Sequence, residues 1–239
     1  MDMKFMPAGD EALVVEFGRI IDDGINRQVH ALAEYVRNEK IYGVRELLPT
    51  FRSLMIFYDN EIISYGKLIR RIKHFKNDGT DALIEEKKIL CVPCCYGGDK
   101  GPDLDYMSIK TGISSEEIIS IHSAVDYKIY MLGFLPGFTY LGGLDERIHM
   151  PRLETPRTSI PAGSVGIGGN QTGVYPVESP GGWWLIGQTP LEFYNPARKK
   201  PVLCNAGEYI RFVRINETDY ELIKRDVENG KYRPRYVCD

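Results

Sequence analysis

The stretch that decides the fold runs from residue 133 to residue 187 and includes GFLPGFTYLGG (133–143) and PAGSVGIGGNQTGVYPVESPGGWWLIG (161–187). Glycine and proline make up roughly a third of these residues, against a usual share near 12%. Glycine allows positive φ angles, proline removes backbone freedom, and the interspersed aromatic residues supply contact area. This composition predicts ordered loops that join short strands, the usual material of a β-barrel or sandwich with a binding surface.

The segments on both sides of this stretch extend the same pattern. Residues 89–96, 127–132 and 209–215 are rich in β-formers and predict strands. Ser114-x-x-Glu117 is a capping box that predicts a short helix ending near Ser123, and residues 217–229 predict a C-terminal helix. We therefore predict a mainly β domain, a barrel or a sandwich, over residues 86–239.

The N-terminal part has a different pattern, in which strands alternate with helices. Residues 12–17 predict a strand, 25–36 a helix, 54–58 a second strand and about 64–77 a second helix. The unbroken apolar run 54–58 predicts a strand covered on both faces. These elements predict a small α+β domain over residues 1–85, with a boundary near 78–88.

Composition excludes several classes of protein. The chain has 239 residues, 43% of them hydrophobic and 26% charged, which excludes wholesale disorder. A net charge of −3 leaves no cationic surplus for nucleic-acid binding. We see no secretory leader and no apolar run of the ~18 residues that span a bilayer, so we predict neither membrane nor nucleic-acid partners and a cytoplasmic location. The odd count of five cysteines argues against a disulfide framework, and we expect Cys91, Cys94 and Cys95 to be structural.

Several standard catalytic and binding motifs are missing. The chain has no P-loop, and residues 166–173 are rich in glycine without the spacing or the following helix of a dinucleotide loop. Residues 162–166 nearly match a nucleophile elbow, yet Ala162 replaces the first glycine. The C-x-x-C at 91–94 has no second pair at zinc spacing, and we predict no bound metal.

The remaining candidates suit an anionic or amide-bearing ligand. Arg152 and Arg157 each follow a proline, and a stiffened guanidinium can bind a carboxylate or phosphate with two hydrogen bonds. The alternative is a solvated loop in which one arginine pairs with Glu154. His122 lies at the end of the capped helix, where it could transfer protons or serve only as a hydrogen-bonding residue.

A second polar group lies at residues 171–173. Gln171-Thr172-Gly173 could form an amide or oxyanion clamp, with a simple hairpin turn as the alternative. Trp183 and Trp184 follow Pro180-Gly181-Gly182, and we expect one in the core and one at the surface.

Five motifs in fixed order give the chain a family resemblance. They are His-x4-Tyr-x5-Gly-Phe-Leu-Pro-Gly-Phe-x-Tyr-Leu (122–141), Pro-Arg-x4-Pro-Arg (151–157), Pro-Ala-Gly-Ser-Val (161–165), Gln-Thr-Gly-x-Tyr-Pro (171–176) and Ser-Pro-Gly-Gly-Trp (179–183). With Gly9-Asp10-Glu11-Ala12 near the N-terminus, they resemble the KipI / allophanate hydrolase subunit 1 family, whose members include the B component of the multi-subunit bacterial 5-oxoprolinase. The same module forms half of the carboxyltransferase region of urea carboxylase. Gln188 departs from the family, many of whose members have an arginine there.

The resemblance implies an α+β N-terminal domain followed by a cyclophilin-like β-barrel. It also implies a partner of the KipA type, the C component of 5-oxoprolinase, with a site in the cleft between the two chains, and a third protein, the A component. The assembly would open 5-oxo-L-proline to L-glutamate with ATP hydrolysis, and we expect ATP to be shared with the partners and no organic cofactor. The alternatives are a regulator that inhibits a sensor histidine kinase, and one part of an allophanate or urea amidolyase.

The resemblance also leads us to assign roles to individual residues. We expect Arg152 and Arg157 as anion-binding catalytic residues, and His122 as an acid–base or orienting residue. The expected substrate contacts are Gln171, Thr172, Gly173, Tyr175, Phe134, Pro136, Gly137 and Phe138.

Overall fold

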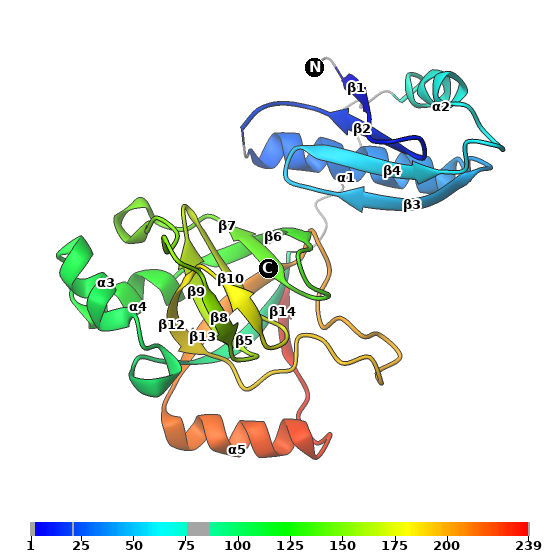
Figure 1. The fold of residues 1–239 in the computed structure, drawn as a ribbon. Helices are drawn as coiled ribbons and strands as arrows, with labels where there is room; N and C mark the ends of the chain where they lie inside the picture. The colour runs from blue at the N-terminus through cyan, green and yellow to red at the C-terminus, as the bar shows by residue number, and fades with distance from the viewer. Residues whose placement is uncertain (1–2, 21, 76–86, 239) are drawn as a thin grey trace. The chain divides into compact units, whose positions relative to one another are not determined.

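The computed structural model describes residues 3–20, 22–75 and 87–238 (Figure 1). The chain divides into two compact units, Met1–Ile84 and Glu85–Asp239, which are described separately below. The predicted domain boundary at residue 85 lies outside the described residues, whereas the predicted second helix is shorter than expected and ends at Ile72 instead of about residue 77.

The first unit is an antiparallel sheet with two helices. Its strands, in the spatial order β1-β2-β4-β3, are β1 (Lys4–Pro7), β2 (Ala12–Glu16), β4 (Ser53–Tyr58) and β3 (Val44–Pro49). Helix α1 (Asp23–Asn38) begins at Asp22, whose carboxylate accepts a hydrogen bond of 2.9 Å from the backbone N–H of Ile25. Helix α2 (Tyr65–Ile72) follows β4. The apolar stripe of α1 packs on one face of the sheet, as its 3.6-residue periodicity predicts.

Strand β4 differs from its prediction. Its residues alternate between fully buried and half-buried, so only one face of the sheet is fully covered. Leu54 and Ile56 face the core with α1, whereas Met55 and Phe57 lie on the other face. Only one face of this strand is fully covered. The apolar run is unbroken because the half-buried opposite face also carries apolar side chains.

The second unit is a closed barrel. Seven strands of the described residues follow each other around it in the order β12-β9-β10-β7-β6-β13-β5, and pairing between β12 and β5 closes the ring. The strands are β5 (Lys88–Tyr96), β6 (Asp126–Leu132), β7 (Thr139–Gly142), β9 (Ser164–Gly168), β10 (Gln171–Val174), β12 (Trp184–Gln188) and β13 (Tyr209–Ile215). Strand β14 (Arg235–Cys238) adds to the free part of β5. Two short strands, β8 (Arg157–Ile160) and β11 (Ser179–Gly181), pair separately. The predicted barrel is thus confirmed, and the cyclophilin-like topology stays a prediction.

Helices are attached to the barrel at several points. They are α3 (Leu104–Thr111), α4 (Ser115–Ser123), α5 (Glu217–Glu228) and the single turns η1 (Gly98–Lys100) and η2 (Glu146–Ile148). The capping box is confirmed, since Ser114 Oγ accepts a hydrogen bond of 3.2 Å from the backbone N–H of Glu117. Among the described residues, no helix is long and apolar enough to cross a membrane.

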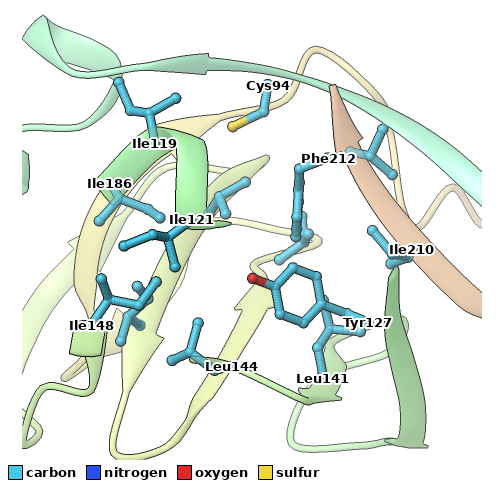
Figure 2. Packing of buried hydrophobic residues seen from close by; sticks show 14 of the residues in the cluster. Cys94, Ile119, Ile121, Tyr127, Leu141, Leu144, Ile148, Ile186, Ile210 and Phe212 are labelled. Atoms are coloured by element: carbon cyan, nitrogen blue, oxygen red, sulfur yellow. The ribbon is translucent and has the colours of Figure 1, made fainter. Parts of the chain in front are cut away.

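The barrel core contains side chains from the barrel strands and from helices α3 and α4. Figure 2 shows Ile121 of α4 beside Tyr127 of β6 and Phe212 of β13, with Cys94 of β5 above them. Cys94 is fully buried and burial raises the pKa of its thiol, which makes it an unreactive packing residue.

Candidate functional site

The predicted site residues gather around β10, whose two faces have different surroundings. Thr172 points into the barrel, whereas Gln171 and Gly173 point outward and lie opposite Gly168 and Gly166 of β9. A Cβ atom added to Gly168 would lie 2.4 Å from the indole of Trp183. Glycine is therefore needed here because the indole lies directly on the backbone of the two strands.

Trp183 is the centre of a second, smaller core on the outer face of the barrel. Phe138 contacts its ring edge-on, with centroids 5.4 Å apart, and Tyr140 and Tyr175 lie at 6.2 and 6.4 Å. Ile160 and Leu185 complete the buried part. We call Phe138, Tyr140, Tyr175 and Trp183 the outer ring cluster.

Arg152 lies at the edge of the outer ring cluster. Its guanidinium carbon is 5.9 Å from the centroid of Trp183, a cation–π distance. Burial raises the pKa of Tyr175 to about 12, and the positive charge of Arg152 opposes that rise. The side chain of Arg152 is exposed, and among the described residues no carboxylate lies within ion-pair distance of it, so its charge is open to solvent beside the rings.

Arg157 has a different environment, and its predicted role as an anion-binding residue is not supported. Its Nη2 donates a hydrogen bond of 2.6 Å to Asp103 Oδ1, and its Nη1 donates to the carbonyl oxygen of Trp183 at 3.2 Å. Asp103 Oδ2 also accepts a 2.6 Å hydrogen bond from the backbone N–H of Leu185. Because Asp103 neutralises its charge, Arg157 positions the Trp183 segment rather than binding an anion.

His122 is fully buried inside the barrel, so it cannot touch a substrate. Thr172 Oγ1 donates its single proton to the carbonyl oxygen of Gly166 at 3.0 Å. It must therefore accept the 2.9 Å hydrogen bond from His122 Nε2–H, which leaves Nδ1 to accept from the hydroxyl of Tyr96 at 2.8 Å. Burial lowers the pKa of His122 to about 3 and keeps the ring neutral. An acid–base role in direct contact with a substrate is therefore not supported, and the predicted orienting role stays a prediction.

Several of the predicted substrate contacts are buried residues next to the outer face or in the barrel core. Each is almost completely covered by protein, because barrel packing or the outer ring cluster occupies the space around it; they are Thr172, Gly173, Tyr175, Gly137 and Phe138. Gln171 is half-buried, and its Nε2 is a buried donor without a hydrogen-bond partner in the described part of the chain.

The hairpin between β6 and β7 carries the remaining two predicted contacts. Phe134 and Pro136 are exposed at its tip, and Phe134 contacts Phe138 edge-on at 5.6 Å. Phe134 has a φ of +67°, an unusual backbone conformation for a bulky residue. The hairpin thus holds an aromatic ring in solvent next to the outer ring cluster.

Sequence reasoning missed Asp103 and Tyr96. Asp103 is 54 residues from Arg157, and no spacing rule connects the two. Tyr96 reads as the last residue of a strand, and only the folded barrel brings its hydroxyl to His122. Tyr140 alternates with buried residues along β7, a signal that could have placed it on the outer face.

Two cavities are lined by residues outside the outer ring cluster. One of about 610 Å³ lies in the first unit between α1 and β3, where Arg45 pairs with Asp59 and Glu11. The other, about 290 Å³, lies at the end of β5 beside Tyr96.

The outer face therefore combines the exposed guanidinium of Arg152 and the partly exposed ring of Tyr140 with a buried amide nitrogen, that of Gln171, which has no partner among the described residues. These groups can bind a small ligand that carries a carboxylate and a carbonyl oxygen. Proton transfer needs groups from elsewhere, because the imidazole of His122 is enclosed.

Known proteins resemble this chain over most of its length. It is 44% identical to the B component of the 5-oxoprolinase of Bacillus subtilis (strain 168), over 91% of this chain and 95% of that protein. It is 38% identical to the B component of the 5-oxoprolinase of Escherichia coli O157:H7, over 87% of this chain and 94% of that protein. The crystal structure of the Kluyveromyces lactis urea amidolyase contains the same fold, with a TM-score of 0.83 at 22% identity; the match covers 99% of this chain and 16% of that much longer one.

The family-level match includes both the first unit and most of the barrel. Residues 3–204 match the family model described as carboxyltransferase domain, subdomain C and D, which confirms the predicted resemblance. The chain therefore belongs to the carboxyltransferase domain family, subdomain C and D.

Proposed function

We propose that this chain is the B component of an ATP-dependent 5-oxoprolinase, which converts 5-oxo-L-proline to L-glutamate together with the C and A components. Similarity to two proteins named as this component of 5-oxoprolinase, over nearly their whole length, supports the assignment. We further propose a cytoplasmic location, and a cyclophilin-like topology for the barrel with an α+β domain before it.

The observation that carries the proposal is the uncompensated guanidinium of Arg152 on the ring of Trp183. The substrate is a small ring with one carboxylate and one lactam carbonyl. In this proposal the carboxylate binds Arg152, the ring lies against the outer ring cluster, and the unpartnered amide of Gln171 turns to the lactam oxygen.

The chemistry needs activation, because a lactam carbonyl is a poor electrophile. Transfer of the γ-phosphoryl group of ATP to the lactam oxygen gives ADP and makes the ring carbon attackable. One water then adds to that carbon and the C–N bond opens with a proton passing to the nitrogen, which leaves an acyl phosphate, and a second water hydrolyses the acyl phosphate to L-glutamate and phosphate. Phosphoryl transfer depends chiefly on positioning and charge stabilisation.

We assign the ATP contacts mainly to the partner proteins. The glycine-rich residues 166–173 do not offer a phosphate cradle, because Gly166 and Gly168 lie in β9 and Gly173 in β10. The space in front of Gly168 is filled by Trp183. This chain would contribute the half of the site that holds the substrate.

The test is reconstitution of the enzyme from this chain with the A and C components of the same organism. We expect 5-oxoproline to be consumed, with ADP and glutamate formed together. Arg152→Ala should lower kcat/KM about a hundredfold, since charge-assisted hydrogen bonds contribute up to ~3 kcal/mol. Arg147→Ala, which removes an exposed arginine paired with Asp145, serves as the matched control and should keep full activity.

Two outcomes would contradict the proposal. If the reconstituted enzyme turns over allophanate or urea and leaves 5-oxoproline untouched, the substrate assignment is wrong. If Arg152→Ala retains full turnover, the site assignment is wrong even when the substrate is right.

A further inference from the structure

Trp184, the first residue of β12, is not a member of the outer ring cluster, although it follows Trp183 directly. Trp183 is 4% exposed, whereas Trp184 is half-buried at the margin of the barrel core. The indole of Trp184 stacks on the phenol ring of Tyr106 in α3, with ring centroids 4.8 Å apart and an angle of 9° between the planes. Tyr106 is 43% exposed, so this stack lies at the protein surface and adds little to the core.

The stack fixes the direction of the single polar group of Trp184. An indole donates through its Nε1–H and has no acceptor. Here Nε1 donates a hydrogen bond of 2.6 Å to the carbonyl oxygen of Pro151, the residue before Arg152. Because the ring lies flat against Tyr106, a rotation that turned the N–H away from this carbonyl would also break the stack.

Hydrogen bonds of this kind frame Arg152 on both sides in the chain. The segment around it belongs to no helix or strand, so no ladder of backbone bonds holds it. On the C-terminal side, the backbone N–H of Leu153 donates to the carbonyl oxygen of Gly182 at 2.8 Å. On the N-terminal side, Trp184 holds the carbonyl of Pro151. The direction in which the Arg152 side chain leaves the backbone therefore depends on the indole of Trp184.

We propose that Trp184 is a positioning residue for Arg152, which holds the guanidinium beside the ring of Trp183 where the substrate carboxylate binds. The inference rests on the proposed function for the identity of the substrate. Trp183 supplies the ring surface, and Trp184 supplies the anchor for the backbone. A guanidinium that is held in place before binding loses less conformational entropy when the carboxylate arrives. Loss of the anchor should therefore weaken substrate binding and leave the chemical step unchanged.

The first test uses the free chain and needs no substrate. The sequence has two tryptophans, so an NMR spectrum of the isotope-labelled chain shows two indole N–H signals, and Trp184→Phe removes one of them. Phenylalanine keeps a ring for the stack on Tyr106 and lacks the N–H. We expect Arg152→Ala to move the Trp183 signal because a charge leaves its ring, and we expect Trp184→Phe to move it too. In an Arg152→Ala background, the change that Trp184→Phe causes should fall to about half or less, since effects that act through one residue are not additive.

The second test measures turnover of 5-oxoproline after reconstitution with the A and C components. Trp184→Phe should raise KM about fivefold and leave kcat unchanged, because one hydrogen bond between uncharged groups is lost. In the Arg152→Ala background, the same substitution should leave KM where it is. Tyr106→Ala removes the stack and should also raise KM. Tyr42→Ala, which removes an exposed tyrosine of the first unit, is the matched control and should keep the wild-type KM.

Each outcome decides the proposal. Equal effects of Trp184→Phe in both backgrounds would overturn it, because Trp184 would then act on the fold and not through Arg152. A Trp183 signal that Arg152→Ala leaves in place would overturn it as well, since the guanidinium would not lie beside that ring. If the free chain shows the expected dependence and the reconstituted assembly leaves 5-oxoproline untouched, the positioning role stands and the proposed function is refuted.

Discussion

The two faces of strand β10 use polar groups in opposite ways. On the inner face, Thr172 lies in a closed chain of hydrogen bonds with Tyr96 and His122, and every proton in it has an acceptor. On the outer face, the amide nitrogen of Gln171 has no partner in the described structure, and Arg152 has no counter-charge there. Satisfied polar groups stabilise a fold, whereas unsatisfied ones are available to a ligand.

The same contrast separates two arginines that look equivalent in the sequence. Arg152 and Arg157 both follow a proline and lie five residues apart. Asp103 pairs with Arg157, whose side chain is 32% exposed, and leaves Arg152 with its charge uncompensated. The two arginines share the same local motif. They differ because Arg157, the structural arginine, has a carboxylate partner, whereas Arg152, the candidate ligand-binding one, has none among the described residues.

The largest effect is expected from the structural arginine. Arg157→Ala removes the partner of a nearly buried carboxylate and should lower the free energy of unfolding by about 2–3 kcal/mol. Arg152→Ala is the matched control and should change it by less than ~0.5 kcal/mol, because no buried group loses a partner. Urea unfolding of both variants measures the difference, and equal losses would refute the distinction between the two arginines.

The next effect tests the inner chain of hydrogen bonds. Thr172→Val keeps the shape of the side chain but leaves His122 Nε2–H without its acceptor in the core. We expect a loss of about 2 kcal/mol in the free energy of unfolding. Thr158→Val on the exposed side of β8 is the control and should have little effect. A Thr172→Val variant as stable as the control would show that the chain of hydrogen bonds contributes nothing.

Local signals predicted much of the fold and little of the site. The cap at Ser114 and strand β6 follow from a few neighbouring residues, and both are confirmed. Strand β14 was missed because its pairing with β5 joins residues over a hundred positions apart. The burial of His122 could not be predicted either, because it depends on the register that brings Thr172 to it from fifty residues away.

A third effect concerns pH and again separates the inner face from the outer one. Burial lowers the pKa of His122 to about 3 in the folded protein, whereas an unfolded histidine titrates near ~6.5. Between these two pH values, His122 binds a proton in the unfolded chain but not in the folded chain. The contribution of His122 to the free energy of unfolding is therefore complete above pH ~6.5. Well below that pH it falls by about 1.4 kcal/mol for each pH unit.

The slope of the free energy of unfolding against pH should be measured between pH 6 and pH 4.5. Asp126, whose pKa the hydrogen bond from Arg211 lowers to about 2, loses its contribution only at lower pH, below its unfolded value of ~3.9. His122→Gln should flatten the slope, whereas His74→Gln, which removes an exposed histidine, should keep it. If the wild-type slope were already flat, His122 would bind its proton in the folded state, and the neutral, enclosed imidazole that distinguishes the inner face would be refuted.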